Sequence, residues 1–278
     1  MILRCYLEVT NVCNLSCIFC PKTTRAPQFI TEDEFHHITD KLVGKVKFLY
    51  LHLMGEPLLH PLLADFVAKA RAKGFLPIVT TNGTLLSKNM PLAEAGAYKL
   101  QISLHSHEGN GKVNPQDYIA GVAEFAKRAS QAGSIVVMRL WNKGGMDSQN
   151  TMLLQLLKSY FTSRWTERSD GLRLAQNVYV EYGDKFDWPD SKNEENHCTE
   201  MFCHALRNQI GVLVDGTVVP CCLDHDGDIA LGNIFHQSLD EILSSHRARA
   251  LYGGFTEHKA VESLCRRCGY AKEKLFHK

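Results

Sequence analysis

Apolar and polar positions alternate with two different spacings along the first two-thirds of the chain. Short runs rich in Val, Ile, Leu or Tyr predict strands, and the longer stretches between them, where apolar residues recur at helical spacing, predict helices. A strand followed by a helix, repeated about six times, predicts parallel strands joined by right-handed crossovers. Because a closed barrel takes eight such units, we expect an α/β fold with an open, partial (β/α)6 TIM-like barrel. The predicted strands are Arg4–Val9, Phe48–Leu53, Leu76–Thr80, Lys99–Ser103, Ile135–Leu140 and Val178–Glu181.

Capping signals mark the ends of the predicted helices. Thr31 and Glu34 form the pattern of a capping box, which opens the first helix. Gly74 and Gly133 follow two amphipathic stretches, as is typical of helix C-caps. The predicted helices are Glu32–Val43, Pro61–Lys73, Gln116–Gln131 and Thr151–Tyr160.

The pattern changes near residue 185. Residues 182–196 are polar and irregular, which is typical of a linker or surface loop. Residues 210–220 then predict a β-hairpin with Asp215-Gly216 at its turn, and a second capping box at Ser238–Glu241 predicts a helix to about Ala250. We therefore expect a barrel domain at 1–185 and a small domain, a hairpin plus a helix, at 186–278.

Composition excludes several classes of function. Lys and Arg total 31 and Asp and Glu total 30, so the formal charge of +1 gives no electrostatic footprint for nucleic acid or for an acidic membrane surface. No apolar run reaches a membrane-spanning length, and the N-terminus lacks the pattern of a secretory signal, which favours the cytoplasm. Ten cysteines in a reducing compartment favour metal ligation over disulfides.

Three of these cysteines, Cys13, Cys17 and Cys20, stand within eight residues after the first predicted strand, where parallel α/β folds place functional groups. Three thiols suit neither disulfides nor a structural zinc site, which takes four ligands. A [4Fe-4S] cluster has four irons, so three thiolates would leave one iron open. The alternative is that the three are buried and pack as small apolar side chains.

The motif Cys13-x3-Cys17-x2-Cys20, with Phe19 before the last cysteine, resembles the radical S-adenosylmethionine (radical SAM) superfamily. The resemblance implies that the three cysteines hold a [4Fe-4S] cluster whose fourth iron binds S-adenosylmethionine (SAM). It also implies reductive cleavage of SAM to a 5′-deoxyadenosyl radical, which abstracts hydrogen from a substrate carbon. In this chemistry the cofactor carries the reaction and the protein positions it.

Two further segments are similar to motifs of that superfamily. Met54-Gly55-Glu56-Pro57 is similar to its Gly-Gly-Glu motif, which receives the ammonium of SAM, although Met54 replaces the first glycine. Thr80-Thr81-Asn82-Gly83 is similar to its Thr-Asn-Gly segment. The resemblance implies that SAM contacts Phe19, Gly55, Glu56 and Asn82.

Polar residues at two later strand ends are further candidates for SAM binding. Ser103 and His105 end the fourth predicted strand, within reach of a ribose or carboxylate, and Arg139 ends the fifth, where it could pair with a carboxylate. Arg139 is also a candidate catalytic residue. The alternative is that all three hydrogen-bond to the barrel rim. Glu8, inside the first strand, is a candidate for the barrel interior, and its role stays open.

The last third of the chain carries a second cysteine group. Its order resembles the twitch variant of the SPASM domain, which implies one auxiliary [4Fe-4S] cluster held by Cys203, Cys221, Cys265 and Cys268. Zinc is the alternative occupant of such a site. Cys198 and Cys222 exceed the need for four ligands, and Cys222 is a candidate hydrogen-atom donor.

The expected function is that of a radical SAM oxidoreductase with SAM and two [4Fe-4S] clusters, performing a two-electron oxidation of a small polar metabolite. The alternatives are a maturase or epimerase of ribosomally made peptides, and a non-catalytic iron–sulfur or zinc protein that serves as a scaffold or redox sensor. The expected partners are the substrate and a reductant such as flavodoxin or ferredoxin, without nucleic acid or membrane.

Overall fold

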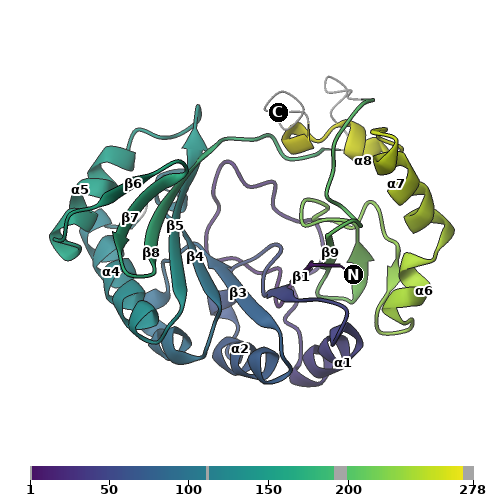
Figure 1. Cartoon of the computed structure of the whole chain (residues 1–278), viewed down its shortest axis with the longest axis horizontal. Helices are drawn as coiled ribbons and strands as arrows, with labels where there is room; N and C mark the ends of the chain where they lie inside the picture. Colours follow the sequence, from purple (N-terminus) through teal and green to yellow (C-terminus); the bar gives the residue numbers. More distant parts are fainter. Residues whose placement is uncertain (1, 111–112, 191–198, 272–278) are drawn as a thin grey trace. The chain divides into compact units, whose positions relative to one another are not determined.

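The structure, a computed structural model, describes residues 2–110, 113–190 and 199–271 (Figure 1). The chain divides into two compact units, each built from segments that are distant in sequence. The first unit comprises Met1–Val12, Pro21–Gly55 and Phe186–Lys278, and the second comprises Cys13–Cys20 and Glu56–Lys185. Each unit is described by itself below.

The first unit contains the strand order β11-β10-β9-β1-β2. Strands β1 and β2 are parallel, as predicted, and β9 pairs with β10 in the predicted antiparallel hairpin. Gly216 at the hairpin turn has φ +81°, a conformation that glycine adopts readily. The elements of this unit are β1 (Arg4–Leu7), α1 (Glu32–Leu42), β2 (Phe48–Tyr50), β9 (Gln209–Val212), β10 (Thr217–Val219), β11 (Gly232–Asn233), α6 (Leu239–Leu243), α7 (His246–Thr256) and α8 (Ser263–Arg266).

An unpredicted feature of this unit is the pairing of β9 with β1. The two strands are parallel, with Arg4 opposite Gln209 and Leu7 opposite Val212. The hairpin of the cysteine-rich region therefore extends the sheet of the N-terminal strand. No local sequence pattern encodes this pairing, because it joins strands that lie far apart in the chain.

The second unit contains the strand order β3-β4-β5-β8-β7-β6. Strands β3, β4, β5 and β8 run parallel, as the alternation of strands and helices predicts. Its elements are α2 (Leu63–Ala72), β3 (Leu76–Thr81), β4 (Lys99–Ser103), α3 (Ser106–Asn110), α4 (Pro115–Gln131), β5 (Ile135–Lys143), α5 (Asn150–Tyr160), β6 (Thr166–Arg168), β7 (Gly171–Ala175) and β8 (Val178–Asp184), with short 3-10 helices at Pro57–Leu59, Leu86–Lys88 and Met90–Glu94.

Strands β6 and β7 form an antiparallel hairpin on β8 that the sequence pattern did not reveal (Figure 1). All three residues of β6 are exposed, so no alternation of buried and exposed positions marks the strand. At Gly171, a Cβ would lie 2.0 Å from the carbonyl oxygen of Val180, so the approach of the β6–β7 turn to β8 requires glycine.

Helix boundaries follow the capping signals, with one correction. Thr31 and Glu34 form the predicted capping box of α1, and Ser238 and Glu241 form that of α6. The single helix expected to run from there to about Ala250 is wrong, because α6 ends at Leu243 and Ser245 starts α7 by accepting a hydrogen bond from the amide of Ala248. A serine whose side chain caps a new helix interrupts the old one.

The buried faces of the long helices supply much of the core. Helix α1 buries Phe35, Ile38 and Leu42, and α4 buries Tyr118 and Phe125 among other residues. Burying a side chain such as Phe contributes about 2–3 kcal/mol. Within the residues that the structure describes, no helix is both long and apolar enough to cross a membrane.

Candidate functional site

The first cysteine group lies on a loop that is held by helix α3. The amide of Ile18 donates to the carbonyl of Gly109 (3.2 Å), and the Cys17 thiol points at the carbonyl of Ser106 (3.9 Å). Cys13 is exposed, Cys17 is buried and Cys20 lies between these extremes. The charges of Cys13 and Cys20 help to raise the pKa of Cys17, after the larger effect of burial, so the three thiols lie close enough to act on one another.

Phe19 fixes the other side of this loop. Its ring lies against the ring of His105, with 5.2 Å between centroids. A Cβ at Gly109 would lie 2.4 Å from the Phe19 ring, so this position of α3 has no room for a larger residue. The structure thereby adds Ser106 and Gly109 as supports of the cysteine loop, which sequence reasoning missed.

Glu56 lies in the same unit, fully enclosed by its neighbours. Its carboxylate accepts hydrogen bonds from the Thr81 hydroxyl (2.7 Å), the Asn82 amide (2.7 Å) and the Leu58 amide (3.0 Å). Burial raises the pKa of Glu56 to about 7, and the three hydrogen bonds oppose that rise. The carboxylate thus connects the segment after Gly55 to the end of β3, the two places where the motifs occur.

Asn82 brings the third motif to the cysteine loop. Its Nδ2 donates to Oδ1 of Asn14 (3.0 Å) and lies 4.0 Å from the Cys13 sulfur. The backbone carbonyl of Asn82 accepts a hydrogen bond from the Tyr118 hydroxyl (2.8 Å), which reaches it from α4. Asn14 stands inside the cysteine motif and was therefore accessible to sequence reasoning, whereas no local signal marks Tyr118.

Gly55 has a backbone that other residues cannot easily adopt. Its φ is +75°, and a Cβ at this position would lie 2.4 Å from the carbonyl oxygen of Thr10 and 2.8 Å from that of Val12. The residue before Glu56 must therefore be glycine for steric reasons of the protein itself.

The strand-end candidates of the second unit meet in one cluster. Ser103 ends β4 as predicted, whereas Arg139 lies in the middle of β5, which continues to Lys143, so its expected place at the strand end is wrong. The Arg139 guanidinium donates to the Ser103 hydroxyl (3.1 Å) and lies over the Trp141 ring at 4.5 Å. Ser103 and Arg139 thus have each other as hydrogen-bond partners, and their contact with SAM stays a prediction.

His105 is held neutral in this cluster. Its Nδ1 lies 3.0 Å from the carbonyl of Arg139. Burial lowers the pKa of His105 to about 4, the hydrogen bond to that carbonyl opposes the shift, and the positive charge of Arg139 adds to it. Protonation of this ring would therefore weaken the fold.

The variant H105Q tests that effect on stability. An unfolded histidine has a pKa near 6.5, so between pH 6.5 and 4 the unfolded chain binds a proton that the folded chain does not, and stability falls as the pH falls. At pH 5 the wild-type chain should lose about 2 kcal/mol, relative to pH 7, that H105Q keeps. Urea unfolding of the metal-free proteins at both pH values measures the difference, and equal losses in the two proteins would contradict it.

The second cysteine group gathers in the first unit. Cys203 precedes β9 and accepts a hydrogen bond from the Ala205 amide (3.4 Å), and Cys221 follows β10. Cys265 lies in α8, and the Cys268 amide donates to its carbonyl (3.3 Å). Cys203 and the other cysteines here raise the pKa of Cys221 well above its usual value, after the larger effect of burial. The four predicted auxiliary ligands are thus within electrostatic range of one another.

This donor set suits an iron–sulfur cluster. Buried thiols without a nearby cation stay protonated, and bound iron deprotonates them by its own charge. In the described ranges, no three Cys, His, Asp or Glu side chains converge closely enough to hold a single metal ion. Ligands of one zinc ion must converge on a point, whereas four thiolates around a cubane bind four different irons and lie farther apart.

Cys222 adjoins the same group, because Cys203 and Cys268 help to raise the pKa of its thiol, after the larger effect of burial. The Tyr6 side chain opposes this rise in the pKa of Cys222, and the Tyr6 ring stacks on Tyr50 with 4.4 Å between centroids. His52 adds an edge contact to Tyr6 at 5.8 Å. Cys198 lies outside the described residues.

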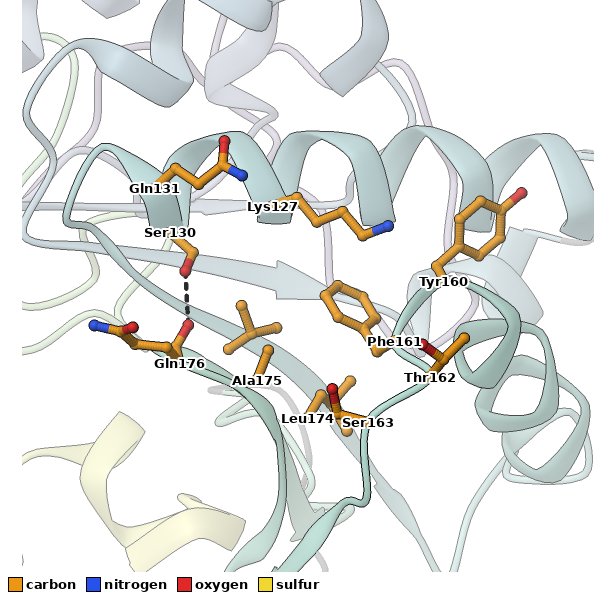
Figure 2. Close-up of a pocket in the computed structure, with 11 residues that line it drawn as sticks. Lys127, Ser130, Gln131, Tyr160, Phe161, Thr162, Ser163, Leu174, Ala175 and Gln176 are labelled. Atoms are coloured by element: carbon orange, nitrogen blue, oxygen red, sulfur yellow. Dashed lines mark hydrogen bonds between the residues drawn. The ribbon is translucent and has the colours of Figure 1, made fainter.

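A hollow elsewhere in the second unit does not coincide with these residues. Figure 2 shows a pocket of about 400 Å³ in which Lys127 lies near the rings of Tyr160 and Phe161, at 5.8 and 5.6 Å from the ring centroids. The hydroxyl of Ser130 donates to the carbonyl of Gln176 beside it (2.6 Å). None of the candidate cofactor residues lines this pocket, so the candidate site rests on the cysteine groups and the motif residues.

Comparison with known families defines the class of protein. The chain belongs to the radical SAM superfamily, whose profile matches residues 7–147. Residues 203–269 match SPASM, an iron–sulfur cluster-binding domain. The families predicted from the cysteine motifs, and their cofactors SAM and iron–sulfur clusters, are thereby confirmed.

Two curated relatives show which parts of the chain are similar to known proteins. The chain is 23% identical over 278 residues to the S-adenosyl-L-methionine-dependent 2-deoxy-scyllo-inosamine dehydrogenase of Niallia circulans, covering 94% of this chain and 90% of that protein. It is 35% identical over 105 residues to the tungsten-containing aldehyde ferredoxin oxidoreductase cofactor-modifying protein of Pyrococcus furiosus, covering 36% of this chain and 30% of that protein. The matches to the first three curated relatives span between 29% and 56% of their lengths.

Solved structures confirm the fold. BtrN in complex with AdoMet and 2-DOIA aligns with a TM-score of 0.61 at 20% identity, covering 96% of this chain and 93% of that one. Streptococcus suis SuiB bound to precursor peptide SuiA aligns with a TM-score of 0.60 at 16% identity, covering 98% and 70%. The predicted class, an α/β partial barrel followed by a cysteine-rich domain, is the fold that these likenesses support.

Proposed function

We propose that this chain is a radical SAM oxidoreductase that oxidises a small polar metabolite by two electrons. The observation that carries the proposal is the gathering of three motifs in one unit, since Asn82 contacts the cysteine loop and Glu56 binds Asn82. A buried carboxylate, an amide side chain and three adjacent thiols together suit a cluster and a ligand that carries an ammonium group.

The residues take the following roles in this proposal. Cys13, Cys17 and Cys20 hold the first [4Fe-4S] cluster, and Phe19, Gly55, Glu56 and Asn82 surround SAM. Ser103 and Arg139 are further SAM contacts, and Arg139 is also a candidate for contact with the substrate. When bound and reduced, SAM supplies a radical that removes hydrogen from an unactivated carbon. The protein excludes water and orients the substrate carbon toward it.

The auxiliary site favours oxidation. A cluster held by Cys203, Cys221, Cys265 and Cys268 would accept the electron that a substrate radical must lose to become a product with a new double bond. The likeness to a 2-deoxy-scyllo-inosamine dehydrogenase over 94% of this chain supports a small polar substrate. The likeness to SuiB, solved with its precursor peptide, supports peptide modification as the second candidate. A low-potential reductant such as flavodoxin or ferredoxin, in a cytoplasm that keeps thiols reduced, completes the proposal.

Anaerobic reconstitution tests the proposal. With iron and sulfide the chain should bind about eight irons, four for each [4Fe-4S] cluster. After reduction with dithionite it should convert SAM into 5′-deoxyadenosine and methionine, measured by liquid chromatography. A chain that binds its iron and yet forms no 5′-deoxyadenosine would refute the enzyme and leave an iron–sulfur scaffold or sensor.

Cys222→Ala is expected to keep both clusters. The likeness to SPASM implies that Cys203, Cys221, Cys265 and Cys268 supply the four ligands, and the nearby Tyr6 side chain gives the Cys222 thiol another neighbour. Iron content and SAM cleavage should both stay near the wild-type values. Loss of about four irons would make Cys222 a ligand. Retained clusters with altered products would instead make it a hydrogen-atom donor.

A further inference from the structure

A buried ion pair joins the N-terminal strand to the segment that follows the first cysteine group. Glu8, whose side chain is fully buried, accepts two hydrogen bonds from the Arg25 guanidinium, at 2.7 and 2.6 Å. The Arg25 side chain is only 15% exposed. A bidentate pair of this kind fixes the orientation of both side chains.

The carboxylate of Glu8 also binds two backbone amides. One is the amide of Met54 (3.3 Å), directly before Gly55, and the other is the amide of Val214 (3.0 Å), at the turn of the β9–β10 hairpin. Replacement of the pair by apolar side chains would leave these amides without an acceptor. Burial of charge by itself contributes little to stability. The role of the Glu8–Arg25 pair is therefore to hold together the segments that contain Met54 and Val214.

Arg25 and its neighbours bind the loop that follows the auxiliary cysteines Cys221 and Cys222. The Arg25 Nε donates to the carbonyl of His225 (3.1 Å). The carboxylate of Asp226 accepts hydrogen bonds from the Thr23 hydroxyl and from both the amide and the hydroxyl of Thr24. Residues 23–25 and 225–226 are thus bound to each other side by side.

These contacts lie close to both cysteine groups along the chain. Arg25 follows Cys20 by five residues, and His225 follows Cys222 by three. The five steps along the chain from Cys20 to Arg25 span at most about 18 Å when fully extended. Order at residues 225–226 therefore restricts the segment that follows Cys20, through its contacts with residues 23–25.

We infer that Glu8 and Arg25 are positioning residues that transmit the order gained on filling the auxiliary site to the segment after Cys20. The inference rests on the proposed function, because it takes both cysteine groups to be cluster sites. Occupancy of the auxiliary site thereby determines how rigidly the segment after Cys20, residues 21–29, is held. The auxiliary cluster acquires a conformational role in addition to its redox role.

Hydrogen–deuterium exchange tests the link without any turnover. In the C13A/C17A/C20A background only the auxiliary site can fill, and iron analysis confirms that it has done so. Exchange of the backbone amides in the peptide 21–29 is then compared between the empty and the filled protein. Filling should slow this exchange by roughly fivefold or more in the wild-type pair, because local opening becomes less frequent.

Three further variants decide whether the ion pair carries the effect. R25Q, which breaks the bidentate pair, should abolish the difference between the empty and the filled protein. D226A removes the acceptor of Thr23 and Thr24 without leaving a charge buried, so it should fold normally and reduce the difference. R128Q is the matched control, since it breaks the exposed pair between Arg128 on α4 and Glu94 and should keep the full effect.

Three outcomes would overturn the inference. Equal exchange in the empty and the filled wild-type pair would do so, and so would full slowing in both R25Q and D226A. If the C13A/C17A/C20A variant took up no iron, the auxiliary site would not be a cluster site, and the inference would be overturned. Failure of the proposed function is a separate result, since that is judged by formation of 5′-deoxyadenosine from the unmodified chain.

Discussion

Replacement of Cys13, Cys17 and Cys20 together with alanine is expected to abolish SAM cleavage and to remove about half of the bound iron, from about eight to about four atoms per chain. Alanine has no donor atom, and the loop has no other thiol to replace the ligands. The fold should persist, because Cys13 is exposed and its loop is held by backbone contacts to α3. Iron analysis and chromatography of 5′-deoxyadenosine measure both effects.

Cys5→Ala is the matched control for that variant. Cys5 is fully buried in β1, where burial raises the pKa of its thiol, so it behaves as a small apolar residue. This variant should keep all of its iron and its SAM cleavage, with a loss of stability of about 1 kcal/mol. Continued formation of 5′-deoxyadenosine by the triple variant would mean that the first cluster site is wrongly assigned.

Gly55→Ala is expected to have the second largest effect. A left-handed backbone costs a residue with a Cβ about 1–2 kcal/mol. The contact of 2.4 Å with the Thr10 carbonyl then forces a backbone shift that costs about 1–3 kcal/mol more. Because Glu56 is the next residue, a displacement near 1 Å should also reduce the rate of SAM cleavage by roughly 100-fold. Urea unfolding and the rate of 5′-deoxyadenosine formation measure the two effects.

Gly44→Ala separates backbone strain from steric clash. Gly44 has nearly the same φ, +73°, but nothing lies within 4 Å of a Cβ placed there. It should lose about 1–2 kcal/mol and keep its rate of SAM cleavage. If Gly55→Ala and Gly44→Ala lose the same stability and both retain activity, the close approach of Gly55 to the Thr10 carbonyl is not required for SAM cleavage.

Sequence patterns predicted the fold where its signals are local. Periodicity and composition of short windows predict the parallel strands within each unit and both capping boxes. The β6–β7 hairpin escaped because its first strand is wholly exposed and therefore has no alternation to detect. The pairing of β9 with β1 escaped because it depends on residues far apart in the chain, whose fit only the folded sheet reveals.

In the candidate site, too, local motifs could be predicted from the sequence and long-range contacts could not. The cysteine spacing and the segments around Glu56 and Asn82 are motifs, so they could be read from the sequence. Residues that hold these motifs in place carry no such signal. The Tyr118 hydroxyl on Asn82 and the Arg25 guanidinium on Glu8 are ordinary side chains until the fold brings their partners within 3 Å.

The pairing of β9 with β1 has a consequence for the order of synthesis. Strand β1 leaves the ribosome before its partner Gln209–Val212, which follows roughly 200 residues later in the chain. At a translation rate of 5–20 residues per second, one edge of β1 waits roughly 10–40 s for its hydrogen-bonding partner. During that interval the unpaired edge is available for pairing with other chains, so a chaperone that covers it would prevent aggregation. A ribosome that stalls before residue 209 therefore releases a chain whose first strand stays half-paired.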